Sequence, residues 1–184
     1  MSPLPFLEPQ NPALALRRGI ALVGLPRSGK TTLGQALAQT LHWPFVDSDT
    51  ALAAALQCPV PEYIKRYGIE AFRQQETRWL HQYCQTPNSE GLTVLSTGGG
   101  LPCHDQLMDT LNTHFVTMYL TLAQPLWLER LFHPPHELSQ RLSKPELESL
   151  YAERHQIYRQ ARYPLLTRHS VEADVAKLLS WIQT

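Results

Sequence analysis

The sequence predicts an α/β fold of three layers (α/β/α), in which helices cover both faces of a parallel sheet of about five strands. Short apolar runs alternate with stretches of helical periodicity, as expected for parallel strands joined by crossover helices. A glycine-bounded motif also follows the first apolar run and opens a helix. With 184 residues and no internal repeat, the chain is most simply one domain, residues 18–184, preceded by an N-terminal arm, residues 1–17.

The strands and helices can be placed in order along the chain. Strands are expected at the apolar runs 20–23, 43–46, 92–96, 115–122 and 163–167. Helices are expected over residues 31–41, 50–56, 61–83, 125–132, 146–162 and 171–182. Asp49 is a plausible N-cap of the second helix and Ser170 of the last, while Gly68 is the weak point of the third. Residues 133–144 show no clear period, so we expect a mobile loop there.

The composition argues against several classes of protein. The formal net charge is zero and the sequence has no block of like charges. Non-specific binding to nucleic acid or to an anionic membrane therefore has no electrostatic basis. No apolar run approaches the ~20 residues of a membrane span, and the N-terminus lacks a signal-peptide pattern. Cys58, Cys84 and Cys103 share no metal-ligand spacing and are expected to be free thiols. We therefore expect a cytoplasmic monomer.

Residues 24–31 read Gly-Leu-Pro-Arg-Ser-Gly-Lys-Thr and match the phosphate-binding pattern G-x-x-x-x-G-K-[ST]. The apolar run before the motif and the helix after it would let backbone N–H groups and a helix N-terminus face one phosphate, which a chance glycine-rich turn would not do. Lys30 can reach the β- and γ-phosphates, and the Thr31 hydroxyl can bind Mg²⁺. The motif predicts a nucleoside triphosphate site with the residues Gly24, Arg27, Ser28, Gly29, Lys30, Thr31 and Thr32.

Two acidic residues and three glycines follow two other expected strands. Ligands of parallel sheets bind outside the C-terminal strand ends, so Asp-Ser-Asp at 47–49 and Gly-Gly-Gly at 98–100 should lie beside the phosphate loop. Phosphoryl transfer needs one carboxylate for the hydrated Mg²⁺ and another for the attacking hydroxyl. We assign Asp47 to the metal and Asp49 to the hydroxyl. Alternatively, Asp49 only caps a helix, Asp47 is a solvated turn residue and the glycines form a simple loop.

Two arginines lie on or beside the apolar faces of expected helices, where burying a charge costs free energy. Arg73 and Glu76 are three residues apart on one expected helix, and Glu76 shares its stripe with apolar residues. Paired with Glu76, Arg73 could offer its fork to an anionic substrate, or the two could form an ordinary exposed salt bridge. Arg154 lies in the middle of the apolar face of residues 146–162. Its partner could be a buried carboxylate or a ligand carboxylate.

Together these pieces resemble the shikimate kinases, a family of P-loop enzymes similar to nucleoside monophosphate kinases. The matching motifs are Gly24–Thr31, Asp47-Ser48-Asp49, Gly68-x-Glu70-x-Phe72-Arg73-x-x-Glu76, Ser96-Thr97-Gly98-Gly99-Gly100 and Glu153-Arg154-x-x-x-Tyr158. The resemblance covers roughly residues 19–182 and implies a P-loop NTPase fold. It further implies transfer of the γ-phosphate of ATP, with Mg²⁺, to the 3-hydroxyl of shikimate, a step toward chorismate and the aromatic amino acids.

The resemblance also implies a role for individual residues. Asp49 would bind the shikimate hydroxyls, and Arg73 and Arg154 would hold the shikimate carboxylate. Arg130 falls where the family has an arginine that stacks on adenine. Lys30 and Thr31 would keep their phosphate and Mg²⁺ roles. Gly99 and Gly100 would offer backbone N–H groups to shikimate, and Gly98 would belong to the same substrate site.

Two positions depart from the family pattern. Ile69 stands where the family usually has glutamate. The family's lid carries Arg-Pro-Leu-Leu, but the corresponding slot in the expected lid, residues 132–145, reads Pro-His-Glu-Leu at 135–138. Either Arg141 replaces the lid arginine, making it catalytic beside Lys30 and Asp49, or that charge is missing. Alternatives are a gluconate- or nucleoside-type kinase and a nucleotide-binding homologue with impaired catalysis.

Overall fold

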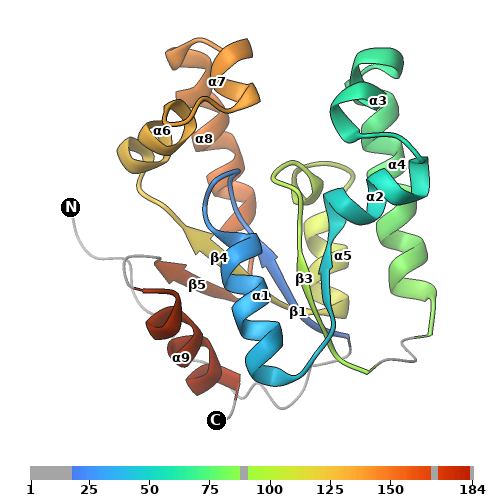
Figure 1. Ribbon diagram of the computed structural model, residues 1–184, viewed down its shortest axis with the longest axis vertical. Helices are drawn as coiled ribbons and strands as arrows, with labels where there is room; N and C mark the ends of the chain where they lie inside the picture. Colours follow the sequence, from blue (N-terminus) through green and yellow to red (C-terminus); the bar gives the residue numbers. More distant parts are fainter. Residues whose placement is uncertain (1–17, 88–90, 167–169, 183–184) are drawn as a thin grey trace.

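The computed structural model describes residues 18–87, 91–166 and 170–182; the expected arm at 1–17 and the predicted strand end at Thr167 lie outside these ranges. Its five strands are all parallel and lie in the order β2-β3-β1-β4-β5. The strands are β1 (Gly19–Val23), β2 (Phe45–Asp47), β3 (Thr93–Ser96), β4 (Val116–Thr121) and β5 (Tyr163–Leu166). Helices cover both faces of the sheet (Figure 1), which confirms the predicted fold class.

The helices follow the strands in alternation, as the sequence pattern indicates. They are α1 (Lys30–Leu41), α2 (Ser48–Leu56), α3 (Val60–Tyr67), α4 (Ile69–Gln85), α5 (Leu107–His114), α6 (Gln124–Phe132), α7 (Glu137–Arg141), α8 (Lys144–Tyr158) and α9 (Val171–Ile182). A short 3-10 helix, η2 (Leu101–Cys103), follows β3. None of the helices in the described ranges is both long enough and apolar enough to cross a membrane.

The alternation of side chains along β1 divides the core into two halves. Ala21 and Val23 pack with α4, α5, α6 and α8 on one face of the sheet. Ile20 and Leu22 pack with α1 and α9 on the other face. Because all four side chains are fully buried, β1 is a central strand, and the loop that follows it is held from both sides.

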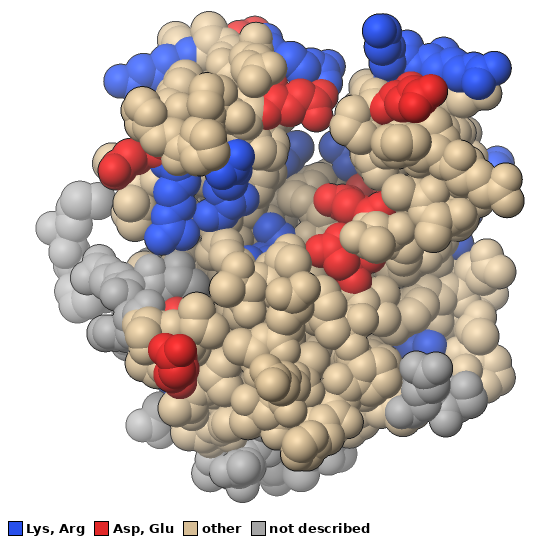
Figure 2. Space-filling model, in the orientation of Figure 1, with Lys and Arg blue, Asp and Glu red and all other residues tan. Residues whose placement is uncertain are grey.

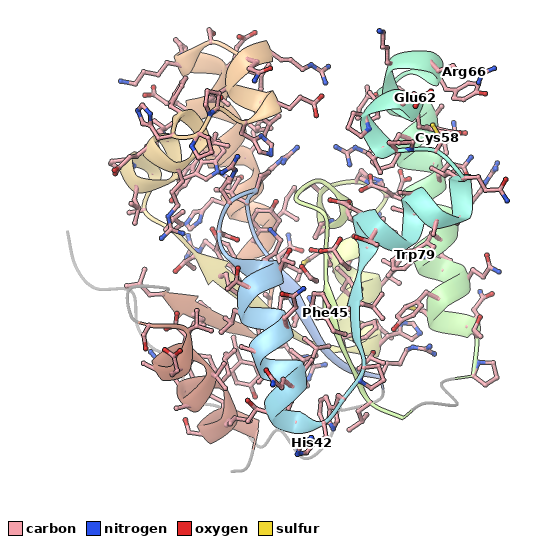
Figure 3. All side chains as sticks on the ribbon, viewed as in Figure 1. His42, Phe45, Cys58, Glu62, Arg66 and Trp79 are labelled. Atoms are coloured by element: carbon pink, nitrogen blue, oxygen red, sulfur yellow. The ribbon has the colours of Figure 1, made fainter. Side chains whose placement is uncertain are left out.

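A close contact fixes α1 against the sheet. Phe45, labelled in Figure 3, comes from β2 and lies over Gly34 of α1. A Cβ at Gly34 would stand 2.7 Å from the Phe45 ring, so only glycine lets the helix approach this closely. The N-terminus of α1 is therefore held in a fixed position at the end of β1.

Five expectations about the helices were wrong. The single helix expected over 61–83 is two helices, α3 and α4, because Gly68 adopts φ 85° and ψ 164° between them. The loop expected over 133–144 contains α7, and α8 covers Lys144–Tyr158 instead of 146–162. The N-cap of α2 is Asp47 rather than Asp49, since Asp47 Oδ1 accepts from the N–H groups of Asp49 and Thr50. No helix was expected where α5 lies.

Candidate active site

Three segments with unusual sequences meet at the carboxyl edge of the sheet, because β2, β3 and β1 are neighbours in that order. The phosphate loop, residues 24–29, leaves β1, Asp47 ends β2, and the three glycines at 98–100 come shortly after β3. Figure 2 shows a hollow above this edge, between the α6–α8 segment on the left and the α2–α4 segment on the right. Basic and acidic side chains line the hollow. The structure therefore brings together the segments that we expected to meet.

The loop between β1 and α1 has the backbone of an anion cradle. Gly24 adopts φ 149°, and a Cβ there would stand 2.9 Å from the Leu120 carbonyl oxygen of β4. Gly29 adopts φ 94° as the N-cap of α1. Arg27, at the exposed tip, adopts φ 64°. Backbone turned in this way directs N–H groups toward one point at the positive end of the α1 dipole, which suits a phosphate.

Lys30 folds across the inside of this loop. Its ammonium donates hydrogen bonds to the carbonyl oxygens of Gly24 at 2.9 Å and Leu25 at 2.8 Å. Burial lowers the pKa of Lys30 to about 8, although the carboxylates of Asp49 and Asp47 oppose this shift. The side chain therefore carries its charge at neutral pH in a site shielded from water, where that charge attracts a phosphate more strongly than it would in solvent.

Asp47 does two things at once. One oxygen, Oδ1, caps α2, and the other, Oδ2, accepts a hydrogen bond from the Thr31 hydroxyl at 3.2 Å. The Thr31 hydroxyl and the Asp47 carboxylate thus lie side by side at the N-terminus of α1. Hard oxygen donors of this kind are the ones Mg²⁺ prefers, and Mg²⁺ keeps several waters of its own, so this pair fits the ion. The cap role that we considered for Asp49 belongs to Asp47, which is not merely a solvated turn residue.

Asp49 lies directly against the first of the three glycines. Its carboxylate lies so close to Gly98 that a Cβ on that glycine would overlap Asp49 Oδ1. The Gly98 N–H is held by the Ser48 hydroxyl at 2.7 Å, which ties the start of α2 to the glycine loop. Desolvation of the carboxylate, followed by the nearby negative charges of Asp47 and Glu76, raises the pKa of Asp49 to about 6. The residue as a whole keeps an exposed surface, and the shift makes Asp49 a stronger base than an aspartate free in solution.

The other two glycines allow equally close approaches. A Cβ at Gly99 would stand 2.6 Å from the Pro26 ring of the phosphate loop, and a Cβ at Gly100 would overlap the Arg73 guanidinium. Any larger residue would push Asp49, Pro26 or Arg73 out of place. Close approach of other segments, and not positive φ, therefore accounts for this run of glycines.

Both arginines singled out in the sequence lie at this loop. Arg73 pairs with Glu76, which is 1% exposed, and the Arg73 guanidinium lies against Gly100. Arg154 comes from α8 and donates to the Gly99 carbonyl oxygen at 3.1 Å, an oxygen that also accepts from the Tyr158 hydroxyl. Within residues 18–87, 91–166 and 170–182, no ion pair joins Arg154 to a carboxylate. Of the two partners considered for Arg154, a buried carboxylate is thus not found there.

Comparison with known proteins shows the family of this chain. A family model described as shikimate kinase matches residues 26–183. The chain belongs to the shikimate kinase family. Shikimate kinase of Enterococcus faecalis is 33% identical over 169 residues, which cover 89% of this chain and 98% of that protein.

Solved shikimate kinases share the fold over nearly the whole chain. The enzyme from Aquifex aeolicus gives a TM-score of 0.79 at 25% identity, covering 90% of this chain and 96% of its own. The enzyme from Acinetobacter baumannii, solved in complex with shikimate, also gives 0.79, at 28% identity, covering 93% and 96%. These likenesses agree with the family motifs that the sequence contains.

The segment expected to form the lid, residues 132–145, contains the short helix α7. Arg141, on α7, is 58% exposed and pairs with Glu137 at 3.0 Å. Burial, and after it the charge of Arg27, lowers the pKa of His136, which caps α7, so this segment lies near the tip of the phosphate loop. Unlike Arg73 and Arg154, Arg141 makes no contact with the glycine loop in the described structure.

Helix α6 is fastened to the outer side of the phosphate loop. Trp127 Nε1 donates to the Pro26 carbonyl oxygen at 3.0 Å, and Arg130 donates to the Arg27 carbonyl oxygen at 3.3 Å. Arg130 thus lies at the loop, on the side where the resemblance implies an adenine contact. Arg130 is partly buried, whereas Arg27 is exposed.

Several residues at the site were not assigned a role from the sequence. Ser48 and Tyr158 lie inside matching motifs, so the motifs could have pointed to them. Trp127 and His104 have no such signal. His104 stands only four residues beyond the last of the three glycines and contacts Glu76, but nothing in the sequence pairs a loop histidine with a helix glutamate.

Proposed function

We propose that this protein is an ATP-dependent shikimate kinase that transfers the γ-phosphate of ATP to the 3-hydroxyl of shikimate. The observation that carries the proposal is the position of two arginines at one glycine loop beside a phosphate cradle. Arg73 lies against Gly100, and Arg154 binds the Gly99 carbonyl. Two guanidinium groups suit the carboxylate of a small acid, and they do not suit a neutral nucleoside base.

The phosphate loop would hold ATP. Phosphate oxygens would replace the loop carbonyls as acceptors for the Lys30 ammonium. Thr31 and Asp47 would hold Mg²⁺ and its waters, and the ion would neutralise charge on the β- and γ-phosphates. Arg130 would lie along the adenine. The remaining contacts to the triphosphate would come from Gly24, Arg27, Ser28, Gly29 and Thr32.

Asp49 would orient the 3-hydroxyl and accept its proton. Its carboxylate lies beside Gly98 and near enough to Lys30 for each charge to shift the pKa of the other. The raised pKa makes Asp49 a better proton acceptor while leaving it ionised at neutral pH. The hydroxyl oxygen would then attack the γ-phosphorus in line with the bond to ADP, which leaves, while the closed lid excludes water.

The pH profile should report Asp49 and Lys30. We expect kcat/KM for shikimate to fall below about pH 6, because protonated Asp49 cannot accept the hydroxyl proton. We expect kcat/KM for ATP to fall above about pH 8, because Lys30 then loses its charge in the free enzyme. In kcat the alkaline fall should move to higher pH, since bound phosphate favours charged Lys30. Steady-state rates at constant ionic strength measure this; an acid limb near pH 4, typical of an unperturbed aspartate, would argue against the role of Asp49.

Arg141 is the candidate for the missing lid arginine, on a lid at about residues 132–145. If α7 moves toward the phosphates, Arg141 would exchange Glu137 for the γ-phosphate, and Arg141→Ala should lower kcat by ~10²-fold or more. Glu137→Ala frees the same arginine without removing it and should keep kcat within about twofold. Unchanged kcat in Arg141→Ala would exclude Arg141 as the replacement.

A coupled ADP assay tests the proposed function. With MgATP, shikimate should release ADP well above background, and quinate, gluconate and nucleosides should release far less. ADP release with gluconate or a nucleoside, and none with shikimate, would favour a different small-molecule kinase. Nucleotide binding without turnover on any of these would favour the impaired homologue. We also propose that the protein is a cytoplasmic monomer with one kinase domain, residues 18–184. Light scattering on the purified protein measures its molar mass and so tests the monomeric state.

A further inference from the structure

Glu76 lies at the centre of a small polar cluster, beside the site proposed to bind the acid substrate. It lies on the core-facing side of α4 and is 1% exposed, so its carboxylate needs partners. Two groups contact the same oxygen, Oε2: the guanidinium of Arg73 and Nε2 of His104, the latter at 3.0 Å. His104 belongs to the segment that follows the three glycines, whereas Arg73 and Glu76 belong to α4.

A second contact fixes His104 from the other side. Asp105 Oδ2 accepts a hydrogen bond from the Thr77 hydroxyl at 2.6 Å and lies 3.4 Å from Nδ1 of His104. The Thr77 hydroxyl is also within 3.0 Å of the Arg73 carbonyl oxygen. The glycine loop is thus tied to α4 at two adjacent residues, Glu76 and Thr77, and the imidazole ring, 16% exposed in its side chain, lies between them.

The hydrogen bond from His104 determines what Glu76 can offer Arg73. A carboxylate left to itself can take a guanidinium with both oxygens, which uses two N–H groups of the arginine. In this structure His104 shares Oε2 with Arg73, and the Arg73 guanidinium lies at Gly100, on the cleft side. Without His104, Glu76 is free to turn and draw the guanidinium toward α4, away from Gly100.

We propose that His104 is a positioning residue: through Glu76 it holds the Arg73 guanidinium at Gly100, and it thereby sets the affinity for the carboxylate of the acid substrate. This inference rests on the proposed function, in which Arg73 binds that carboxylate. It assigns His104 no contact with the substrate and no part in phosphoryl transfer. The effect therefore belongs to KM for the acid and leaves KM for ATP untouched.

Two substitutions of the same chemistry but different reach test the proposal. The amide nitrogen of Gln can stand where Nε2 of His104 stands, whereas that of Asn is too short to reach Glu76. We expect His104→Asn to raise KM for shikimate ~10-fold, the loss of one hydrogen bond to a charged group, with kcat and KM for ATP within about twofold of the wild type. His104→Gln should restore KM for shikimate to within about threefold. His42→Asn, at the exposed C-cap of α1 and at the opposite end of the molecule from the cleft (Figure 3), is the matched control and should change nothing.

The outcomes separate this inference from the proposed function. Wild-type turnover of shikimate tests the proposed function. The ratio of KM for shikimate in His104→Gln to that in His104→Asn tests the role of His104. Equal KM values for shikimate in the wild type and His104→Asn would overturn the inference. So would a His104→Gln variant whose KM for shikimate is as high as that of His104→Asn. A parallel loss in KM for ATP or in kcat would show a merely structural role and overturn it too. Thermal melting of both variants checks that they are folded, and if the wild type turns over another small acid, the same ratios are measured with that acid.

Discussion

Asp49→Asn should lower kcat for shikimate by ~10³-fold, the middle of the range for the loss of a general base. The amide keeps the shape of the side chain beside Gly98 but cannot accept the hydroxyl proton. Steady-state kinetics with saturating MgATP and shikimate measure the loss. Asp109→Asn, on the exposed side of α5, makes the same chemical change elsewhere and should leave kcat unchanged.

The stability of the same variant gives an independent check. Because desolvation of the carboxylate and the charges of Asp47 and Glu76 raise the pKa of Asp49, the ionised carboxylate is less favourable in the folded protein than in the unfolded chain. This cost is present above about pH 6 and disappears as pH falls below the unfolded value. At pH 7.5 the melting temperature of Asp49→Asn should therefore equal or exceed that of the wild type. An active variant, or an inactive one that has also lost stability, would contradict the assignment.

Lys30→Met should produce the other large loss, with kcat lowered ~10³-fold and weaker nucleotide binding. The methionine fills similar space but removes the charge that the phosphates would meet and the hydrogen bonds to Gly24 and Leu25. Rapid-quench measurement of ADP, together with titration of a fluorescent nucleotide, separates the two effects. Lys65→Met, an exposed change on α3, serves as the control. Retained kcat in Lys30→Met would show that the triphosphate is not held as proposed.

Periodicity and strand-end reasoning predicted the layers of the fold and the meeting of three segments. Both rest on local patterns, since β1 is apolar throughout and the phosphate loop follows it directly. The break at Gly68 and the helix α7 could not be predicted with the same assurance. Gly68 is compatible with a continuous helix until its φ is known, and α7 is a five-residue helix stabilised by a cap from His136 rather than by an apolar face.

The site was predictable where one residue acts through its position in a motif. Lys30, Asp49, Arg73 and Arg154 all lie at the expected edge of the sheet. Contacts between distant segments could not be predicted in this way. The pairing of His104 with Glu76 joins residues 28 positions apart, and no helix or strand period relates them. The predicted N-cap of α2 was wrong because Asp47 and Asp49 both satisfy the preference for aspartate at an N-cap. Only the backbone geometry distinguishes them.

The most direct test of the account is the structure of the product formed from shikimate and MgATP. Phosphorus–proton correlation by NMR on the reaction mixture identifies the carbon that carries the new phosphate. We expect one phosphorylated product per ADP, with the phosphorus coupled to the proton at carbon 3 of shikimate. ADP without a phosphorylated acid, or phosphate on another hydroxyl, would contradict the proposal that Asp49 orients the 3-hydroxyl while Arg73 and Arg154 hold the carboxylate.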